Sequence, residues 1–197
     1  MGAGGLRVTG GRLGGRRLRA PARGTRPTAD RVREALFARL GDLRGTRVLD
    51  LYAGSGALGV EALSRGADSV VFVERAAATL AVLRGNVTAL GLSAEARVIG
   101  DDVARAVRRL GRSGERFDLV LLDPPYAGDE AARALEALVD SGALADGAVV
   151  VVEHSRRHPL PGATGLALLD ERRYGDTAIT RLTATLRLRG SGGSETG

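Results

Sequence analysis

Residues 48–59 constrain the fold of this chain more than any other stretch. They read V-L-D-L-Y-A-G-S-G-A-L-G, an apolar run that contains Asp50 and is followed by Gly54, Gly56 and Gly59. The pattern predicts a strand, a tight turn and the start of a helix. Because glycine has no Cβ and tolerates positive φ, a ligand can approach the backbone of such a turn closely. We therefore expect a nucleotide-like cofactor at the end of this strand.

From residue 47 onward, strand-like apolar runs alternate with helical patterns. Strands are predicted at 47–52, 69–74, 96–99, 117–122 and 148–153, and helices at 57–65, 76–90, 102–111 and 129–141. Runs that are apolar throughout, such as 70–73 and 149–152, are typical of a parallel sheet covered on both faces. Two further strands, 166–174 and 177–188, are joined by a turn at Gly175 and Asp176. We assign an α/β domain to residues 46–189 and a disordered tail to residues 190–197.

Residues 1–45 are predicted to form a separate extension. Residues 6–20 indicate a short β-hairpin whose leucines and valine face a core. The next segment predicts a helix from about residue 29 to 40, with Thr28 as its N-cap and Asp30 opposing the helix dipole. The hairpin arginines expected to face outward are Arg7, Arg12, Arg16, Arg17 and Arg19.

Positive charge is concentrated in this extension. Residues 1–47 carry 12 Arg and 3 acidic residues, a net charge of +9, whereas the remainder carries 17 Arg and 20 acids, a net charge of −3. All 29 cationic side chains are Arg. A GC-rich genome would explain the missing Lys, but it would not explain the uneven charge. Arg pairs with phosphate through two hydrogen bonds, so the extension predicts contact with RNA.

The composition also excludes several classes of protein. The chain has no Cys and only two His, His154 and His158, so disulfides, thiolate chemistry and a His-rich metal site are not expected. No run of about 18 apolar residues is present, and the N-terminus lacks the apolar region of a secretory signal. These features predict a cytoplasmic protein without a metal.

The second site-forming segment is Asp123-Pro124-Pro125-Tyr126, which follows an apolar strand. Two prolines remove N–H donors and stiffen the turn, so a carbonyl oxygen and the Asp123 carboxylate remain as acceptors. Such a pair suits a planar exocyclic amine, and Tyr126 would stack on its ring. Hydrogen bonds to both N–H groups would turn the nitrogen lone pair toward a methyl donor, and Asp123 or water would take the proton that the nitrogen loses. The alternative is an ordinary Asp-Pro turn.

Other acids are placed to hold a cofactor. Glu74 follows Gly54 by 20 residues and suits ribose hydroxyls. Asp102, rather than Asp101, is favoured for an adenine amino group, although either would also serve as a helix cap. Glycine turns of this kind also bind NAD and FAD. Asp50 and the 123–126 segment favour S-adenosylmethionine instead. The predicted cofactor residues are Asp50, Tyr52, Gly54, Ser55, Gly56, Glu74, Arg75, Asp102 and Asp123, with Glu153 and His154 as further strand-end candidates.

Three segments together carry a family resemblance: R-P-T-A-D-R-V-R-E-A-L-F at 26–37, D-L-Y-A-G-S-G-A-L-G-V-E-A-L-S-R-G-A at 50–67, and D-P-P-Y at 123–126. From about residue 6 to 186 the chain closely resembles the bacterial RsmD-type 16S rRNA guanine-N2 methyltransferases. The resemblance implies a Rossmann-like class I methyltransferase fold with a seven-stranded, mostly parallel sheet and helices on both faces. It also implies S-adenosylmethionine as methyl donor and one guanine of 16S rRNA, within an assembled small-subunit particle, as target.

By position, the resemblance assigns the guanine to residues 123–126 and closure of the site over cofactor and RNA to Arg26, Thr28, Asp30 and Arg31.

Alternative functions remain open from the sequence. An adenine-N6 methyltransferase acting on RNA or DNA would use the same segment, since adenine is also a planar amine. A nicotinamide-dependent oxidoreductase would share the glycine turn, and a non-catalytic RNA-binding assembly factor would share the fold. Cytosine-C5 methylation is disfavoured because it ordinarily needs a Cys nucleophile.

Overall fold

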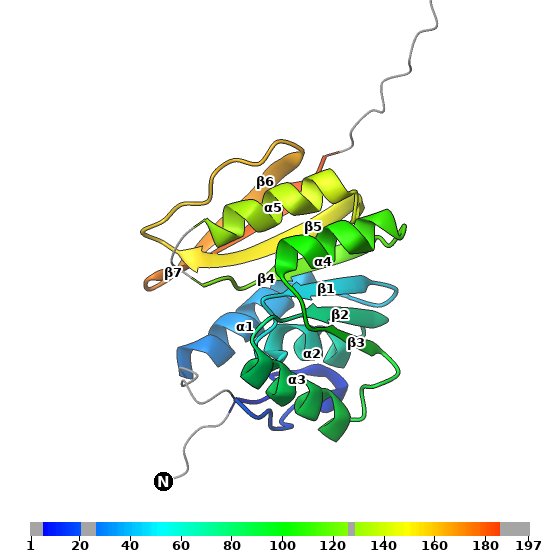
Figure 1. The fold of residues 1–197 in the computed structure, drawn as a ribbon. Coiled ribbons are helices and arrows are strands. Elements are labelled where there is room, and N and C mark those ends of the chain that lie inside the picture. Colours follow the sequence, from blue (N-terminus) through cyan, green and yellow to red (C-terminus); the bar gives the residue numbers. More distant parts are fainter. Residues whose placement is uncertain (1–5, 21–26, 126–128, 186–197) are drawn as a thin grey trace, which may run out of the picture.

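β1 (Arg47–Leu51) is an interior strand of a seven-stranded sheet, with β2 on one side and β4 on the other, and the glycine turn follows at its carboxyl end (Figure 1). The computed structural model describes residues 6–20, 27–125 and 129–185. The strand order is β3-β2-β1-β4-β5-β7-β6. The first five strands pair in parallel, and β7 is antiparallel to both β5 and β6. The predicted mostly parallel α/β fold is confirmed.

The alternation of strands and helices also agrees with the prediction. The strands after β1 are β2 (Ser69–Val73), β3 (Ala96–Ile99), β4 (Phe117–Leu122), β5 (Leu144–Ser155), β6 (Leu166–Tyr174) and β7 (Thr177–Ala184). The helices are α1 (Pro27–Leu40), α2 (Ala57–Ser64), α3 (Ala77–Ala89), α4 (Val103–Arg112) and α5 (Glu130–Ser141), and a 3₁₀ turn, η1, spans Gly11–Leu13. The largest difference is β5, which begins four residues before the predicted 148–153 strand.

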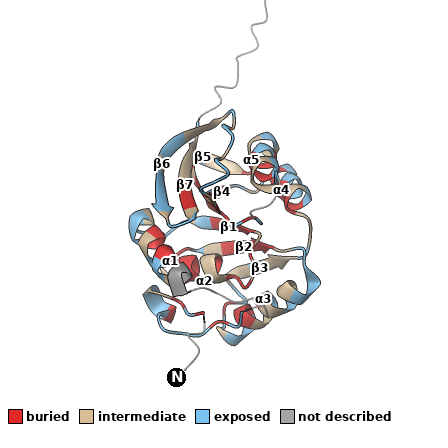
Figure 2. Cartoon of the chain, turned by 90° about the vertical axis from the view of Figure 1, so that its left-hand side faces the viewer, coloured by how far each residue is buried: buried red, intermediate tan, exposed pale blue. Residues whose placement is uncertain are grey.

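Two separate cores form because successive strand residues point to opposite faces of the sheet. Val48 packs in one core with apolar side chains of α1, α2 and α3, whereas its neighbour Leu49 packs in the other core with α4 and α5. Figure 2 shows the buried strand residues between these two helical layers. Because both faces are covered, the open positions lie at the carboxyl ends of the strands.

The N-terminal hairpin is less regular than predicted. A single antiparallel bridge joins Arg7 to Arg17, and η1 forms its tip, with Gly11 at φ +72° and Gly15 at φ +82°. Glycines at these positions favour tight turns over extended strands, which explains the irregular backbone. The prediction of which hairpin side chains face the core and which face outward is nevertheless confirmed. Leu6, Val8, Leu13 and Leu18 are buried in the α1–α3 core, and Arg7, Arg12, Arg16, Arg17 and Arg19 are exposed.

Buried polar groups of α2 fix the hairpin to the rest of the protein. The fully buried Glu61 carboxylate accepts hydrogen bonds from the Thr9 backbone N–H and hydroxyl, both at 2.7 Å. Ser64 Oγ accepts from the Leu13 N–H at 2.9 Å. The hairpin therefore packs as part of the folded core. The division of the chain at residue 46 and the disorder of residues 190–197 stay predictions, the tail lying outside the described residues.

The predicted N-cap of α1 is wrong. The helix begins at Pro27, one residue before Thr28, so Thr28 lies in its first turn. Proline suits the first helical position because its missing N–H would have no partner there and its φ is already helical. The end at Leu40 is as predicted, with Gly41 at φ +76°.

Two absences concern only the described residues. None of the helices in residues 27–125 and 129–185 is both long and apolar enough to cross a membrane. No group of three or more His, Cys, Asp or Glu residues within the described part of the chain is arranged to hold a metal ion.

Candidate active site

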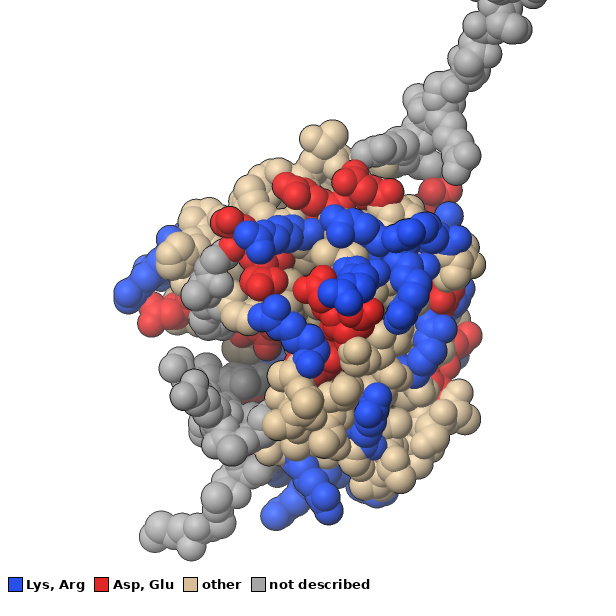
Figure 3. Space-filling view, in the orientation of Figure 1, with Lys and Arg blue, Asp and Glu red and all other residues tan. Residues whose placement is uncertain are grey.

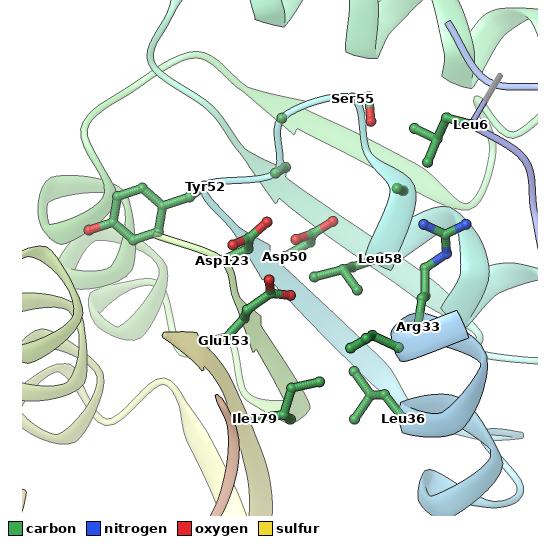
Figure 4. Close-up of a pocket in the computed structure, with 14 residues that line it drawn as sticks. Leu6, Arg33, Leu36, Asp50, Tyr52, Ser55, Leu58, Asp123, Glu153 and Ile179 are labelled. Carbon is green, nitrogen blue, oxygen red and sulfur yellow. The ribbon is translucent and has the colours of Figure 1, made fainter. Parts of the chain in front are cut away.

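Two adjoining cavities open where β1, β4 and β5 end. The inner cavity has a volume of about 180 Å³ and lies between the glycine turn and α1, as Figure 4 shows. The outer cavity has a volume of about 590 Å³ and reaches the ends of β2 and β3. Four residues line both: Tyr52, Gly54, Asp123 and Glu153. The two segments singled out in the sequence, the glycine turn and the Asp-Pro-Pro segment, therefore meet in one site.

The glycines of the turn have different roles. Gly54 has φ +57° and lines both cavities, and a Cβ there would come no closer than 3.8 Å to a neighbouring atom, Tyr52 O. Gly56 lines neither cavity; its φ is +84°, and a Cβ would lie 2.5 Å from Leu83 Cδ1. Gly54 thus presents bare backbone to the site, while Gly56 shapes the turn. Ser55, also predicted, lines the inner cavity.

Asp50 lines the inner cavity from the middle of the sheet. Its residue surface is only 1% exposed, and its Oδ2 accepts a 2.9 Å hydrogen bond from the N–H of Gly59 in α2. Burial raises the pKa of Asp50 well above the usual value, and the carboxylates of Asp123 and Glu74 raise it further. A buried acid held in this way favours a cationic ligand group beside it.

Glu74 bridges the glycine turn and α3. Its Oε2 accepts from the Gly54 N–H at 3.0 Å and its Oε1 from the Ala76 N–H at 2.7 Å, and it lines the outer cavity. Each carboxylate oxygen has a second lone pair, so Glu74 can still accept from a ligand hydroxyl. Arg75 lines the same cavity and pairs with Glu130 at 3.9 Å.

The structure separates the two aspartates after β3. Asp102 lines the outer cavity and also caps α4, accepting from the Arg105 N–H at 3.2 Å. Asp101 does not line the cavity and instead lies 3.5 Å from Arg105 and 3.7 Å from Arg109. Of the two, Asp102 is the one placed to reach a ligand. The capping alternative considered from the sequence also applies to it.

Tyr52 adopts an unusual backbone conformation. Its φ is +58°, the one positive value for a non-glycine residue in the described part of the chain. Its hydroxyl donates to Glu130 Oε2 at 3.0 Å, and burial together with this bond raises the pKa of Tyr52. Such a conformation is uncommon and tends to occur where a binding site requires it. Here it places the ring at the junction of the two cavities.

Asp123 faces Glu153 across the mouth of both cavities (Figure 4). Asp123 is an exposed residue at the rim of this concave site, and the surrounding protein encloses its carboxyl group only in part. That enclosure, followed by repulsion from the Glu153 carboxylate, raises the pKa of Asp123 to about 7. Pro124 and Pro125 line the outer cavity beside it. The Asp-Pro-Pro segment thus presents a carboxyl group that titrates near neutral pH.

Several lining residues were not among the predicted cofactor or catalytic residues. They come from the hairpin, from α1, from the strand ends and from β7: Leu6, Val32, Arg33, Leu36, Glu153 and Ile179. Glu153 was only a strand-end candidate. The side chains of α1 reach the site through tertiary packing, which no local spacing reveals. His154, the other strand-end candidate, lines neither cavity; its Nε2 lies 2.8 Å from Thr180 Oγ1.

The RNA-contact candidates whose side chains the structure describes line neither cavity. The five hairpin arginines are exposed, and Arg12 pairs with Glu95 at 2.5 Å. Arg31 is exposed on α1. Arg26 and Tyr126, including its proposed stacking role, lie outside the described residues, and Thr28 is placed only by its backbone.

The strand order, the glycine turn after β1 and the acids at the strand ends define a class I, Rossmann-like methyltransferase fold. The comparisons agree. The model of the family described as Conserved hypothetical protein 95 matches residues 6–183. Bacillus subtilis YlbH is 38% identical over 178 residues, which cover 88% of this chain and 96% of YlbH.

Two matches from Escherichia coli, one a sequence and one a solved structure, extend this result. Ribosomal RNA small subunit methyltransferase D is 38% identical over 162 residues, 81% of this chain and 80% of the relative. The solved structure of yhhF has a TM-score of 0.82 and 34% identity, covering 93% of this chain and all of yhhF. The chain therefore belongs to the Conserved hypothetical protein 95 family, the family of RsmD and YlbH.

Proposed function

We propose that this protein transfers a methyl group from S-adenosylmethionine to the exocyclic N2 of a guanine in 16S rRNA of the small ribosomal subunit. One observation carries the proposal: the glycine turn after β1 and the Asp123 segment after β4 line the same two cavities. Ribosomal RNA small subunit methyltransferase D, a relative at 38% identity, supports an rRNA substrate by its name.

The residues present fit S-adenosylmethionine. Gly54 offers open backbone, and the acids lining the two cavities are Asp50, Glu74, Asp102, Asp123 and Glu153. A concave site with this excess of carboxylates suits a ligand that carries a sulfonium and an ammonium group. Glu74 and Asp102 would hold the ribose and adenine parts, and Asp50 would lie near the methionine part. When bound, the cofactor supplies an electrophilic methyl group.

The chain's own residues would orient the amine. The conjugated amino group of guanine is a poor nucleophile, so catalysis depends mainly on positioning and on acceptors for its N–H groups. Asp123 would accept one N–H and then take the proton that nitrogen loses. Its pKa of about 7 matches proton transfer near neutral pH. The exposed hairpin arginines would contact the RNA backbone.

The direct test uses purified protein, labelled S-adenosylmethionine and small ribosomal subunits that lack the modification. We expect N2-methylguanosine in the 16S rRNA, identified by mass spectrometry of the nucleosides. Methylation of adenine N6, in RNA or in DNA, would contradict the assigned substrate and support the alternative. In a thermal-shift assay, stabilisation by S-adenosylhomocysteine is expected, whereas stabilisation by NAD(H) alone would contradict the cofactor.

Variants of Asp123 test its role. Asp123→Ala is expected to lower turnover by at least about 100-fold, the usual scale of acid–base catalysis, with near-normal affinity for S-adenosylhomocysteine. Asp146→Ala is the matched control, because Asp146 is exposed on β5 and lines neither cavity. Equal losses of cofactor binding and of rate in Asp123→Ala would contradict a substrate-side role.

A further inference from the structure

The exposed face of α4 is unusually basic. Its exposed side chains are all arginines: Arg105, Arg108, Arg109 and Arg112. The helix contains no acidic residue, so its charge is +4, whereas α5 beside it carries Glu130, Glu136 and Asp140 against Arg133, a charge of −2. Figure 3 shows the basic side chains gathered over α4. An Arg-rich composition alone would not leave one helix at +4 and its neighbour at −2.

Nearby carboxylates neutralise only part of this charge. Asp101 is shared by Arg105 and Arg109, at 3.5 and 3.7 Å. Arg97, exposed on β3, pairs with Glu115 at 2.5 Å, and Arg116 is exposed between α4 and β4. No ion pair among the described residues involves Arg108 or Arg112. We call the six arginines Arg97, Arg105, Arg108, Arg109, Arg112 and Arg116 the α4 ridge; with Asp101 and Glu115 its net charge is +4.

The α4 ridge starts at the candidate active site. Asp102, which caps α4, lines the outer cavity, and Arg105 lies one turn further along the helix. Ten residues of α-helix extend about 15 Å from that point. Arg97 and Arg109 also line a groove of about 470 Å³ between β3 and α4. A ligand bound at the cavity mouth therefore has a continuous basic path leading away from it.

The basic hairpin lies on the other side of the sheet. Its polar contacts include α2 and α3, for example the paired hydrogen bonds of Asn86 with the backbone N–H and C=O of Arg19, both at 2.9 Å. Those helices cover the sheet face opposite to α4 and α5 (Figure 1). The Arg19 end of the hairpin adjoins the inner cavity, because Asn86 also donates to the carbonyl oxygen of Ser55, which lines that cavity. A basic surface thus lies on each face of the sheet and reaches the edge where the cavities open.

We propose that the α4 ridge binds the phosphate backbone of the RNA substrate, so that RNA is held on both sides of the active-site edge. The occupant follows from charge: the ridge keeps a net charge of +4 after its carboxylates are counted, and Arg108 and Arg112, which take part in no ion pair among the described residues, lie one turn apart on α4. Guanidinium groups spaced in this way can contact successive phosphates. The proposal rests on the proposed function for the identity of the substrate, but its test measures RNA binding and not methyl transfer.

The test replaces Arg108 and Arg112 together by glutamine (R108Q/R112Q). Both lie outside the ion pairs, so the double variant leaves no carboxylate without a partner. With 16S rRNA transcribed in vitro, each lost phosphate contact lowers the slope of log K against log salt by about 0.7 to 0.9. We expect the slope to fall by about 1.4 to 1.8 and the Kd at 0.15 M salt to rise roughly 10- to 30-fold. The affinity for S-adenosylhomocysteine should not change.

The control is R44Q/R172Q, which also removes two exposed positive charges, from the loop before β1 and from the edge strand β6. Arg44 pairs with the exposed Asp42, so this variant also tests whether a freed surface carboxylate changes the slope. We expect it to leave the slope unchanged. Equal effects of the two double variants would overturn the proposal, because only net charge would then matter. The proposal would also be overturned if R108Q/R112Q bound naked rRNA normally but lost methylation of assembled particles. That result would indicate that the ridge contacts a ribosomal protein and not RNA. If the wild type binds RNA through the ridge but methylates no guanine, only the proposed function fails.

Discussion

At the residue scale, the surroundings of Asp123 predict the pH dependence of the proposed reaction, because burial and then the Glu153 carboxylate raise its pKa. Because the pKa of Asp123 is raised to about 7, this carboxyl is mostly protonated at pH 6 and mostly ionised at pH 8. In the proposed reaction, only the ionised form can accept a proton from the substrate nitrogen. We therefore expect kcat/KM to rise with pH and to level off above an apparent pKa near 7.

Glu153→Gln should shift this profile. The substitution removes the negative charge that raises the pKa of Asp123, so the rising limb should move to lower pH. The measurement is kcat/KM between pH 5 and 9 for wild type and variant. His154→Gln is a control at the next residue, whose side chain lines neither cavity. If the pH profile of kcat/KM is the same in Glu153→Gln and in the wild type, its rising limb does not reflect the ionisation of Asp123.

Asp50 illustrates a conflict between stability and ligand binding. Its pKa is raised by burial, so the native state binds a proton that the unfolded chain releases at lower pH. The stability that comes from protonating Asp50 is therefore complete below pH 4 and is lost as pH rises through the native pKa. Above pH 4 the folded chain must either keep a proton on Asp50 or bury its charge, and the hydrogen bond from the Gly59 N–H is the one cause that lowers the pKa.

We predict that Asp50→Asn stabilises the ligand-free protein at pH 8 and weakens cofactor binding. The amide oxygen can still accept from the Gly59 N–H without the cost of a buried charge. A gain of about 1 kcal/mol would raise Tm by about 2–4 °C in a chain of this size, and the gain should shrink at pH 5. The measurement is thermal unfolding at both pH values, with S-adenosylhomocysteine titrated separately. A lower Tm at pH 8 would contradict the prediction.

At the element scale, the packing of α2 on β2 depends on Gly59. A Cβ there would lie 2.3 Å from Cε1 of the fully buried Phe72 and 2.8 Å from Val70 Cγ1. Neither side chain has room to move. Gly59→Ala should therefore lower the free energy of unfolding by about 1–3 kcal/mol, the usual cost of overpacking.

Gly85→Ala is the control for this prediction. Gly85 is also a helical glycine, in α3, but a Cβ there would meet nothing within 4 Å. Because alanine favours helix, this change should raise the free energy of unfolding by about 0.5–1 kcal/mol. Chemical denaturation of both variants measures the two effects. Equal effects of both substitutions would show that intrinsic helix propensity, and not the contact with Phe72, governs Gly59.

The elements also show which parts of the structure could be predicted from the sequence. Local patterns were sufficient for β3 and β4, because each is a short, mainly apolar segment with a charged residue before it and a glycine or an acid after it. They were not sufficient for the hairpin, whose conformation depends on glycine turns and on buried partners in α2 such as Glu61. The start of α1 was misplaced because Thr28 is a common cap and Pro27 was not considered as a helical residue.

The residues of the candidate site also divide into those that local patterns predict and those that depend on tertiary packing. The residues at the strand ends, Asp50, Gly54 and Asp123, were identified because the carboxyl ends of parallel strands meet at one edge. The α1 side chains Val32 and Leu36 were missed because they reach the inner cavity only through packing between elements distant in sequence. Gly56 was assigned to the cofactor from its spacing, but the structure shows it facing Leu83.

At the scale of the whole molecule, the proposed grip on both faces of the sheet predicts how separate losses combine. The hairpin variant R17Q/R19Q removes two exposed charges beside α2 and α3, and R108Q/R112Q removes two from α4. The sites share no partner and lie on opposite sheet faces, so their effects on binding free energy should add if one RNA contacts both. The quadruple variant should then lose about the product of the two fold-changes in Kd.

This additivity distinguishes one RNA bound across the edge from two alternative binding surfaces. If each surface bound RNA independently, either double variant alone would change the Kd by no more than about 2-fold, and only the quadruple variant would lose binding. If one RNA bridges the edge, each double variant loses affinity, because the second contact then forms at high effective concentration. Binding curves of the four proteins at several salt concentrations decide the question. A small loss of RNA affinity in each double variant, together with a large loss in the quadruple variant, would exclude simultaneous contact of one RNA with both surfaces. RNA would then reach the cavities between the two surfaces from one side at a time.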